Sequence, residues 1–254
     1  MKHIVSIHAH PDDAEILCCG TLAHLASRGH RITIVTMTPG DKGSKTQTPD
    51  EIAERRRGEG RKAAERIGAA YVCAEFRDLA IFNDDPSRRR VVELLRSLQP
   101  DIVLTSSPAD YLCDHEATSI LVRDGCFAAP APNYVTGANP AAPALAHIPH
   151  LYYMDAIGGA DREGTPIYPH FVVDVTATFE TKRAMLADHE SQRLWLQDHH
   201  EMDNYLTTME DWTKVCGSRG GVALGEGFRQ YSGHPYPGSP LLQELLEGLV
   251  VAVR

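Results

Sequence analysis

Short apolar runs alternate along the chain with longer segments in which apolar residues return every three or four positions. The short runs predict β-strands over residues 4–7, 32–37, 71–74 and 102–105, and later over 151–154 and 171–173. The helical period predicts helices over residues 16–28, 50–67, 88–98, 181–195, 203–215 and 241–249. Gly29, Gly68 and Pro100 follow the first three of these segments, where helices commonly end.

Strands and helices alternate through the first half of the chain, which predicts a parallel sheet with helices on both faces. We therefore expect an α/β fold with a Rossmann-like, mostly parallel sheet. Residues 1–254 are predicted to form one domain, with a core over about residues 1–127 and a carboxyl-terminal elaboration over 128–254. The proline-rich stretch 128–149 is predicted to be a surface excursion or a lid, ordered by a partner subunit.

Polar segments follow three of the predicted strands. HAHPDDAE (8–15) follows the first strand, TPGDKGS (38–44) the second, and SSPADYLCDH (106–115) the fourth. The carboxyl ends of parallel strands meet at one edge of a sheet, and ligands bind there in open α/β folds. The three segments are therefore the predicted site.

The charge and composition of the chain argue against two classes of partner. The 254 residues carry a formal net charge of -9, so we expect no nucleic-acid partner. No apolar stretch approaches the ~18 residues of a spanning helix, so we expect no membrane partner. The six cysteines have no CxxC spacing, which indicates free thiols and a cytoplasmic location. Cys113 is expected to be a buried thiol.

His10, Asp13 and His115 stand out as a candidate metal set. Two imidazoles and one carboxylate suit a divalent first-row metal, zinc above all, and three protein ligands leave a fourth position open for water. The alternative is that all three are solvated loop residues. Asp12 is then a candidate general base, since a carboxylate beside that water can take its proton. Its alternative role is to cap the helix that begins near Ala14.

These residues carry a resemblance to a known family. His10-Pro11-Asp12-Asp13-Ala14-Glu15, followed by Gly20-Thr21-Leu22, resembles the signature of the PIG-L / LmbE-like deacetylase family. The loop 38–43 is similar to the family's second-strand loop, and the segments 76–79 and 110–115 fall in family order. The resemblance covers roughly residues 3–127 well and the remainder loosely. It implies a zinc-dependent enzyme that removes acetyl groups from N-acetylglucosamine-type amides.

The resemblance implies a role for each matching residue. His10, Asp13 and His115 would bind zinc (Zn2+), with another divalent first-row metal as the alternative. Asp12 would be the base that also carries a proton to the leaving amine. The partner would be a small N-acetylated sugar or glycoconjugate.

Further matching residues are candidates for substrate binding. Arg56 and Asp78 would hold sugar hydroxyls, since charged hydrogen bonds are strong and directional. The alternatives are a solvated helix face for Arg56, which has arginines on both sides, and a turn for Asp78. Asp41 is a third candidate, with a plain turn as its alternative. Trp195 and Trp212 are expected in the core.

One departure from the family pattern concerns the oxyanion. The family commonly carries His-Pro-Asp-His where this chain has Leu112-Cys113-Asp114-His115, and Leu112 offers no donor. Either zinc alone carries the charge, or another donor substitutes, the candidates being Tyr111, His189 and His234. Some relatives are oligomers that insert a carboxyl-terminal histidine into a neighbouring site, which implies a homo-oligomer here (a trimer or a hexamer) and His234 as the inserted residue. The alternative for His234 is a histidine of a surface loop. Asp114 is either a partner of the metal ligands or, as we favour, a helix cap.

The sequence leaves two other functions open. One is an amidase that cuts a bulkier acyl or thiol conjugate with the same groups. The other is a non-catalytic metal- or sugar-binding relative, although binding alone would not need Asp12. A nucleotide-binding Rossmann protein is disfavoured because no G-x-G-x-x-G turn follows the first strand.

Overall fold

The computed structural model describes residues 1–200 and 205–253, in which eight strands form one sheet. Their bounds are β1 (His3–His8), β2 (Arg31–Thr36), β3 (Ala70–Cys73), β4 (Ile102–Thr105), β5 (His150–Met154), β6 (Phe171–Asp174), β7 (Gly225–Tyr231) and β8 (Val250–Ala252). The order across the sheet is β3-β2-β1-β4-β5-β7-β6-β8. The first five in that order run parallel, and the remaining pairings are antiparallel. The predicted α/β fold with a mostly parallel sheet is confirmed.

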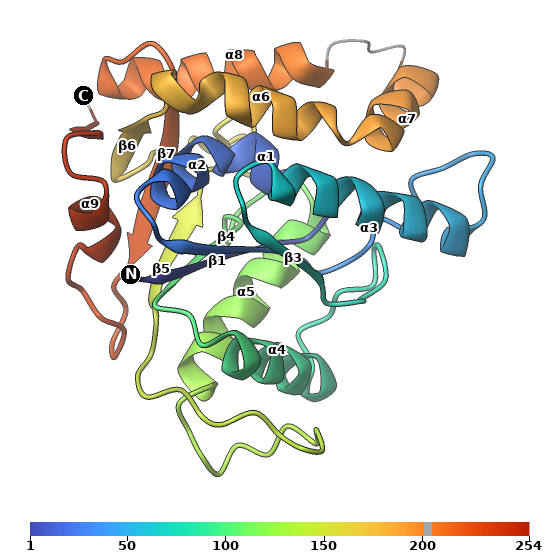
Figure 1. Ribbon diagram of the computed structural model, residues 1–254, viewed down its shortest axis with the longest axis vertical. Helices are drawn as coiled ribbons and strands as arrows, with labels where there is room; N and C mark the ends of the chain where they lie inside the picture. The colour runs from blue at the N-terminus through green and yellow to red at the C-terminus, as the bar shows by residue number, and fades with distance from the viewer. Residues whose placement is uncertain (201–204, 254) are drawn as a thin grey trace.

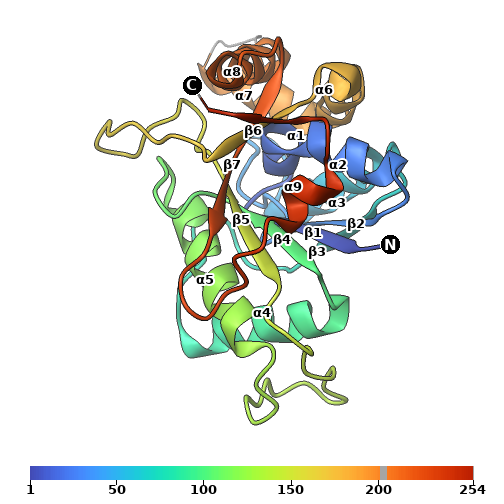
Figure 2. The ribbon, with the colours of Figure 1, turned by 90° about the vertical axis from the view of Figure 1, so that its left-hand side faces the viewer.

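Helices cover both faces of this sheet. Their bounds are α1 (Asp13–Leu17), α2 (Cys19–Ser27), α3 (Pro49–Glu65), α4 (Asp85–Leu98), α5 (Cys113–Ala128), α6 (Phe179–Ala187), α7 (Glu190–His200), α8 (Tyr205–Gly220) and α9 (Leu241–Leu245). Helices α4 and α5 lie on one face, and α1, α2 and α3 on the other (Figures 1 and 2). Helices α6 and α7 pack outside α1, α2 and α3, while α8 packs on β6 and β7.

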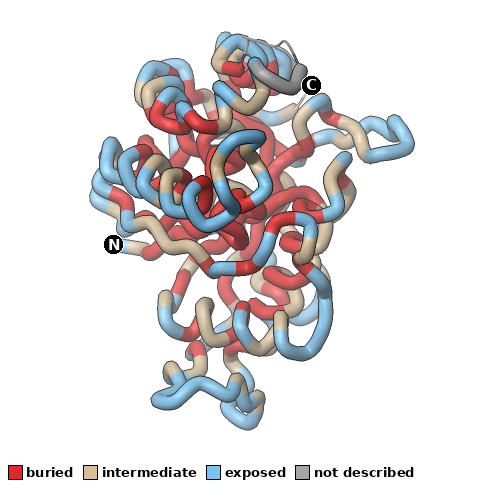
Figure 3. Tube along the Cα trace, turned by 90° about the vertical axis from the view of Figure 1, so that its right-hand side faces the viewer, coloured by how far each residue is buried: buried red, intermediate tan, exposed pale blue. Residues whose placement is uncertain are grey.

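Side chains of the central strands alternate between two hydrophobic cores. In β1 and β4, Ile4 and Ile102 join the core beneath α1 and α2, while Val5 and Val103 join the core beneath α4 and α5. Successive residues of a strand point to opposite faces, so near-continuous apolar runs mark strands buried on both sides. Figure 3 shows the buried residues concentrated along the middle of the molecule.

The strand order places the predicted site at a switch point. β1 pairs with β2 on one side and with β4 on the other, so the chain leaves β1 and β4 toward opposite faces of the sheet. The crevice at such a reversal, outside the carboxyl ends of the strands, is where open α/β sheets bind ligands. The segments 8–15 and 106–115 both begin there.

The helices depart from prediction at two breaks. The helix expected over 16–28 begins earlier, at Asp13, and breaks at Cys18 into α1 and α2. The helix expected over 181–195 is interrupted between α6 and α7 at Asp188, whose carboxylate accepts from Lys62 and Arg66. The helix expected over 203–215 is observed as α8. Positions 203 and 204 of that prediction lie outside the described residues.

The excursion does not form a lid. Glu93 of α4 accepts hydrogen bonds from the Thr136 hydroxyl (2.6 Å) and the Ala142 N–H (2.7 Å), and Arg96 donates to the Ala129 carbonyl (3.0 Å). These bonds hold residues 128–149 beside α4 and α5 (Figure 1). None of these residues lines the cavity at the metal group, so of the two predicted alternatives the surface excursion is observed and the lid is not.

Two observations concern the surface. Among the described residues, no helix combines the length and the hydropathy needed to cross a membrane. Cys113 is exposed, so the prediction that it is buried is wrong. It begins α5, where its side chain points away from the core that the following turns of the helix contact.

Candidate metal centre

The turn after β1 holds the HPDD residues at the edge of the sheet. Asp12, just before α1, has a φ of 103°, in the left-handed region that residues with a side chain rarely adopt. Strain of this kind clusters at functional sites, where surrounding contacts hold it in place. The Asp12 side chain makes no capping hydrogen bond to α1, so the alternative role as a cap is not observed.

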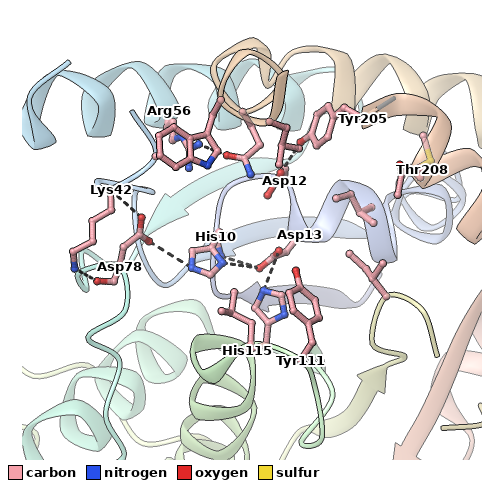
Figure 4. A pocket seen from close by; sticks show the side chains of 18 of the residues that line it. His10, Asp12, Asp13, Lys42, Arg56, Asp78, Tyr111, His115, Tyr205 and Thr208 are labelled. Carbon is pink, nitrogen blue, oxygen red and sulfur yellow. Dashed lines mark hydrogen bonds and ion pairs between the residues drawn. The ribbon is translucent and has the colours of Figure 1, made fainter. Parts of the chain in front are cut away.

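His10, Asp13 and His115 surround a common point, their ligand atoms all within 4.8 Å of one another. Asp13 lies between the rings, 3.6 Å from His10 Nδ1 and 3.4 Å from His115 Nε2. The His10 backbone N–H donates to the Asp13 carboxylate at 2.9 Å, which fixes that side chain. Figure 4 shows the three converging from the β1–α1 turn and from α5. Two imidazoles and one carboxylate at a common point fit zinc, and three ligands leave a coordination position open.

Carboxylates behind the rings orient them. His115 Nδ1 lies 2.9 Å from the Asp110 carboxylate, which leaves Nε2 as the ligand atom. His10 Nε2 lies 3.2 Å from Asp114 and 3.5 Å from Asp78, which leaves Nδ1 on the side of the common point. Carboxylate–histidine pairs of this kind set the tautomer and raise the basicity of metal-binding imidazoles.

The prediction that Asp114 caps α5 is wrong. The residue at the N-cap position is Leu112, and Asp114 lies two residues further on, within the first turn of the helix. Its carboxylate accepts the Leu79 N–H at 2.7 Å in addition to contacting the His10 ring. Asp114 therefore connects α5 to the loop after β3 and to a candidate ligand.

The imidazoles and carboxylates of the cluster shift one another's pKa values. Burial lowers the pKa of His10, but the hydrogen bonds with Asp114 and Asp13 outweigh it and raise that pKa to about 9. Burial lowers the pKa of His115 too, yet the neighbouring charge of Asp13 carries it well above the ordinary value. Burial raises the pKa of Asp13, and the two imidazoles hold it well below the ordinary value. Protons on the rings balance the carboxylates, and a bound cation would replace them.

Asp12 occupies a different environment one residue away. Its carboxylate is buried and accepts a hydrogen bond of 2.5 Å from the Tyr205 hydroxyl of α8. Burial and the adjacent charge of Asp13 raise the pKa of Asp12 to about 6, although His189, Tyr205 and Arg56 act to lower it. Two adjacent carboxyl groups therefore have pKa values moved in opposite directions, the pattern that separates a ligand from a proton acceptor.

A cavity of about 450 Å³ opens above these groups, within the size range of small-molecule sites. Its charged side contains Lys42, Arg56 and Asp78, together with the amide of Gln192. The buried Arg56 guanidinium donates to Gln192 and passes Gly40 and Gly43, where any side chain would collide with it. The glycines of the TPGDKG loop thus leave room for Arg56 to reach the cavity.

The structure brings most of the predicted site residues to this cavity. Of three neighbouring arginines, Arg56 lines it, whereas Arg55 and Arg57 form ion pairs with glutamates elsewhere. Asp78 lines it while accepting hydrogen bonds from the Thr38 hydroxyl (2.6 Å) and the Lys42 N–H (3.0 Å). Tyr111 lines it with its ring edge-on to His115, at 5.3 Å between centroids.

Other candidates lie outside the cavity. Asp41 accepts from the Asp78 N–H at 2.9 Å and from Arg77, and it supports the loop that carries Asp78. His189 is buried 3.2 Å from Glu15. His234 is exposed and lines a separate hollow with Tyr231 and Tyr236, so within one chain it does not meet the metal group.

Among the cavity residues that were not singled out from the sequence are three that contact the proposed site residues. Tyr205 and Gln192 come from helices in the second half of the chain, and Lys42 from the TPGDKG loop. The one sequence signal for Lys42 is that a basic residue lies in a glycine-containing loop after a strand. Helical periodicity alone could not single out Tyr205 or Gln192. Trp195 was expected in the core, but it is partly exposed and lines the cavity, whereas Trp212 is buried as expected.

The fold and site define a class of protein. Residues 5–126, just under half of the chain, match the family described as PIG-L: GlcNAc-PI de-N-acetylase.

Individual relatives make the comparison more specific. The chain is 26% identical over 243 residues to a diacetylchitobiose deacetylase of Thermococcus kodakarensis, which covers 90% of this chain and 83% of that protein. The solved structure of N,N'-diacetylchitobiose deacetylase from Pyrococcus horikoshii superposes with a TM-score of 0.75 at 25% identity, over 94% of this chain and 88% of that one. A 4-oxalmesaconate hydratase of Pseudomonas putida is 25% identical over 195 residues, or 73% of this chain and 72% of that protein.

Proposed function

We propose that the protein is a zinc-dependent N-deacetylase that hydrolyses the N-acetyl amide of a small N-acetylglucosamine-type sugar or glycoconjugate, releasing acetate and a free amine. One observation carries the proposal: the three candidate metal ligands and a separate carboxylate, Asp12, line the same cavity. The deacetylase relatives support the same reaction. We further propose a cytoplasmic homo-oligomer, a trimer or a hexamer.

The metal ligands would be His10, Asp13 and His115, with Asp110 and Asp114 holding the two rings in place. A zinc ion held there would polarise the amide carbonyl and lower the pKa of a water molecule in the open position. Asp13 serves as a ligand because the imidazoles keep it ionised over a wide pH range.

Asp12 is the proposed general base. With a pKa of about 6 it is ionised near neutral pH, and it is basic enough to take a proton from the attacking water. The same carboxyl group then delivers that proton to the amine nitrogen as the amide C–N bond breaks. Its Tyr205 hydrogen bond holds it in place for both transfers.

The charged side of the cavity would bind the sugar. Arg56 and Asp78 offer a fixed donor and a fixed acceptor to hydroxyl groups, and Lys42 lies beside Asp78. Asp41 acts from behind by holding the Asp78 loop. For the oxyanion, Tyr111 is the proposed donor from the same chain. His234 is the proposed donor from a neighbouring subunit.

Metal analysis combined with an acetate-release assay tests the proposal. The wild-type protein should bind one zinc ion and release acetate from an N-acetylglucosamine derivative such as diacetylchitobiose. Asp12→Asn should keep the zinc and lose turnover by about 10²- to 10⁴-fold, the usual contribution of a general base. Zinc bound without acetate release from any N-acetyl sugar would instead favour the non-catalytic relative or an amidase for another conjugate.

A hydratase is the second candidate, because a hydratase relative spans 73% of the chain. A hydratase would add water to a conjugated unsaturated carboxylate. The ultraviolet absorbance of that substrate would then fall, and neither acetate nor amine would be released. The ultraviolet assay of such a substrate, run beside the acetate assay, separates the two reactions. The apolar end of the cavity, lined by Ile16 and Met209, disfavours a substrate that carries several carboxylates.

A further inference from the structure

The cavity has two chemically different ends on either side of the metal group. Lys42, Arg56 and Asp78 lie together at one end, and Thr208 marks the other, with Tyr205 beside Asp12 between them (Figure 4). The end marked by Thr208 lies under α8. Met209, the neighbour of Thr208 in α8, lines the cavity, and so do three aliphatic side chains from α1, the segment after β5 and α7: Ile16, Ile157 and Leu196.

These side chains form a continuous apolar surface. Ile16 and Leu196 pack against the buried cluster that contains Met209 and Tyr205. Ile157 adds to it from the segment that follows β5, and both Ile157 and Ile16 pack against the large core beneath α1 and α2. Met209 is buried, whereas Ile16, Ile157 and Leu196 are partly exposed toward the cavity. This surface is named here the acyl wall.

The direction of the substrate follows from the two ends. Sugar hydroxyls need hydrogen-bond partners and therefore lie toward Arg56 and Asp78. The amide carbonyl lies at the metal group, so the acyl carbon points away from the sugar, toward the acyl wall. An acetyl group has a single methyl to place there and would leave most of that apolar surface in contact with water.

We propose that the acyl wall receives an N-acyl chain longer than acetyl, and that the preferred substrates are N-acyl glucosamine-type sugars with a short straight chain such as butanoyl or hexanoyl. This inference rests on the proposed function, since it assumes hydrolysis of a sugar amide at the metal group. Burial of one methylene changes affinity about fourfold, so butanoyl should exceed acetyl by about 15-fold in kcat/KM.

A series of N-acyl glucosamines tests the proposal. The zinc-loaded full-length protein is assayed for amine release from the N-acetyl, N-propanoyl, N-butanoyl and N-hexanoyl sugars. Leu196→Gln places a polar amide in the acyl wall and should lower the butanoyl-to-acetyl ratio of kcat/KM from about 15 to near 1. Leu194→Gln is the matched control on the same helix, outside the cavity, and should leave the ratio unchanged. If Leu196→Gln folds poorly, Ile157→Thr, in the loop after β5, should lower the same butanoyl-to-acetyl ratio of kcat/KM.

The outcomes separate the inference from the proposed function. A rising kcat/KM along the series, lost in Leu196→Gln and kept in Leu194→Gln, supports the acyl wall. Acetate release that is faster than butanoate release overturns it and leaves the deacetylase function standing. Absence of amine release from every sugar in the series overturns the proposed function, and the inference with it.

Discussion

At the scale of single residues, the strained backbone of Asp12 is held by a side chain from the other end of the chain. Tyr205 donates to its carboxylate at 2.5 Å from α8, and the buried pair of His189 and Glu15 lies close by. A non-glycine residue at a φ of 103° persists only where its surroundings determine its position. Tyr205 is therefore a positioning residue for Asp12.

Tyr205→Phe should weaken catalysis and move its pH dependence. The hydroxyl stabilises the ionised carboxylate, so its removal raises the pKa of Asp12 above about 6. In its proposed role as a base Asp12 must be ionised, so the acid limb of the kcat/KM profile should move to higher pH. A hydrogen bond to a charged group contributes about 1.5–3 kcal/mol, or about one to two pKa units, which predicts a loss of roughly 2- to 15-fold in kcat/KM near pH 7.

The control for Tyr205→Phe is Tyr231→Phe, a tyrosine away from the cavity, which should leave the profile of kcat/KM against pH unchanged. Coincident acid limbs for Tyr205→Phe and wild type would show that the hydroxyl does not act on Asp12.

Asp110→Asn should weaken metal binding. Asp110 orients His115 through a contact of 2.9 Å, and loss of such a partner typically lowers metal affinity 10- to 100-fold. Competition for zinc against a chromophoric chelator measures this. Asp124→Asn, on the helix α5 that carries His115 and paired with Arg123, is the control. Equal zinc affinity in the Asp110 variant and in wild type would rule out this role.

At the scale of helices and strands, the buried carboxylate of Glu226 joins the two halves of the chain. Lys182 of α6 lies 2.6 Å from Glu226 of β7, and both are almost fully buried. The same carboxylate accepts the backbone N–H groups of Gly20 (2.9 Å) and Thr21 (2.8 Å) at the start of α2. Three elements distant in sequence therefore depend on one carboxylate, which the favourable end of the α2 dipole also stabilises.

Lys182→Met should destabilise the protein strongly. It leaves the Glu226 charge buried without its cation, and breaking a buried pair in this way costs about 3–5 kcal/mol of unfolding free energy. Chemical denaturation measures the loss. The double variant Lys182→Met/Glu226→Gln should recover part of it, because no charge then remains buried. Lys214→Met, which removes an exposed pair with Glu210, should change little, and a similar small effect at Lys182 would contradict the argument.

At the scale of the whole molecule, the two halves of the chain differ in how far sequence reasoning reaches. The proposed ligands His10 and Asp13 follow a buried strand directly, and His115 follows a neighbouring strand, so periodicity and topology together predict that they meet. Gln192 reaches the same cavity from α7, and Tyr205 reaches it from α8. Helical periodicity alone does not indicate which face of a helix meets a distant loop.

Strand β7 was not predicted for a related reason. Its sequence GEGFRQY contains two glycines and three charged or amide side chains, the opposite of a buried strand. Its position depends on tertiary partners: Glu226 meets Lys182, and Gly225 allows close packing against Gly217. Local pattern carries no information about such long-range pairing, and the same holds for the break between α6 and α7.

The division of the cavity between the two halves of the chain has an evolutionary consequence. The proposed hydrolytic groups belong to the segments that follow β1 and β4, whereas two of the four acyl-wall residues, Leu196 and Met209, belong to α7 and α8. Drift or selection along α7 and α8 would therefore alter which acyl chains are accepted while leaving bond cleavage intact. A library of variants restricted to those two helices is the natural starting point for redirecting this scaffold to new amides.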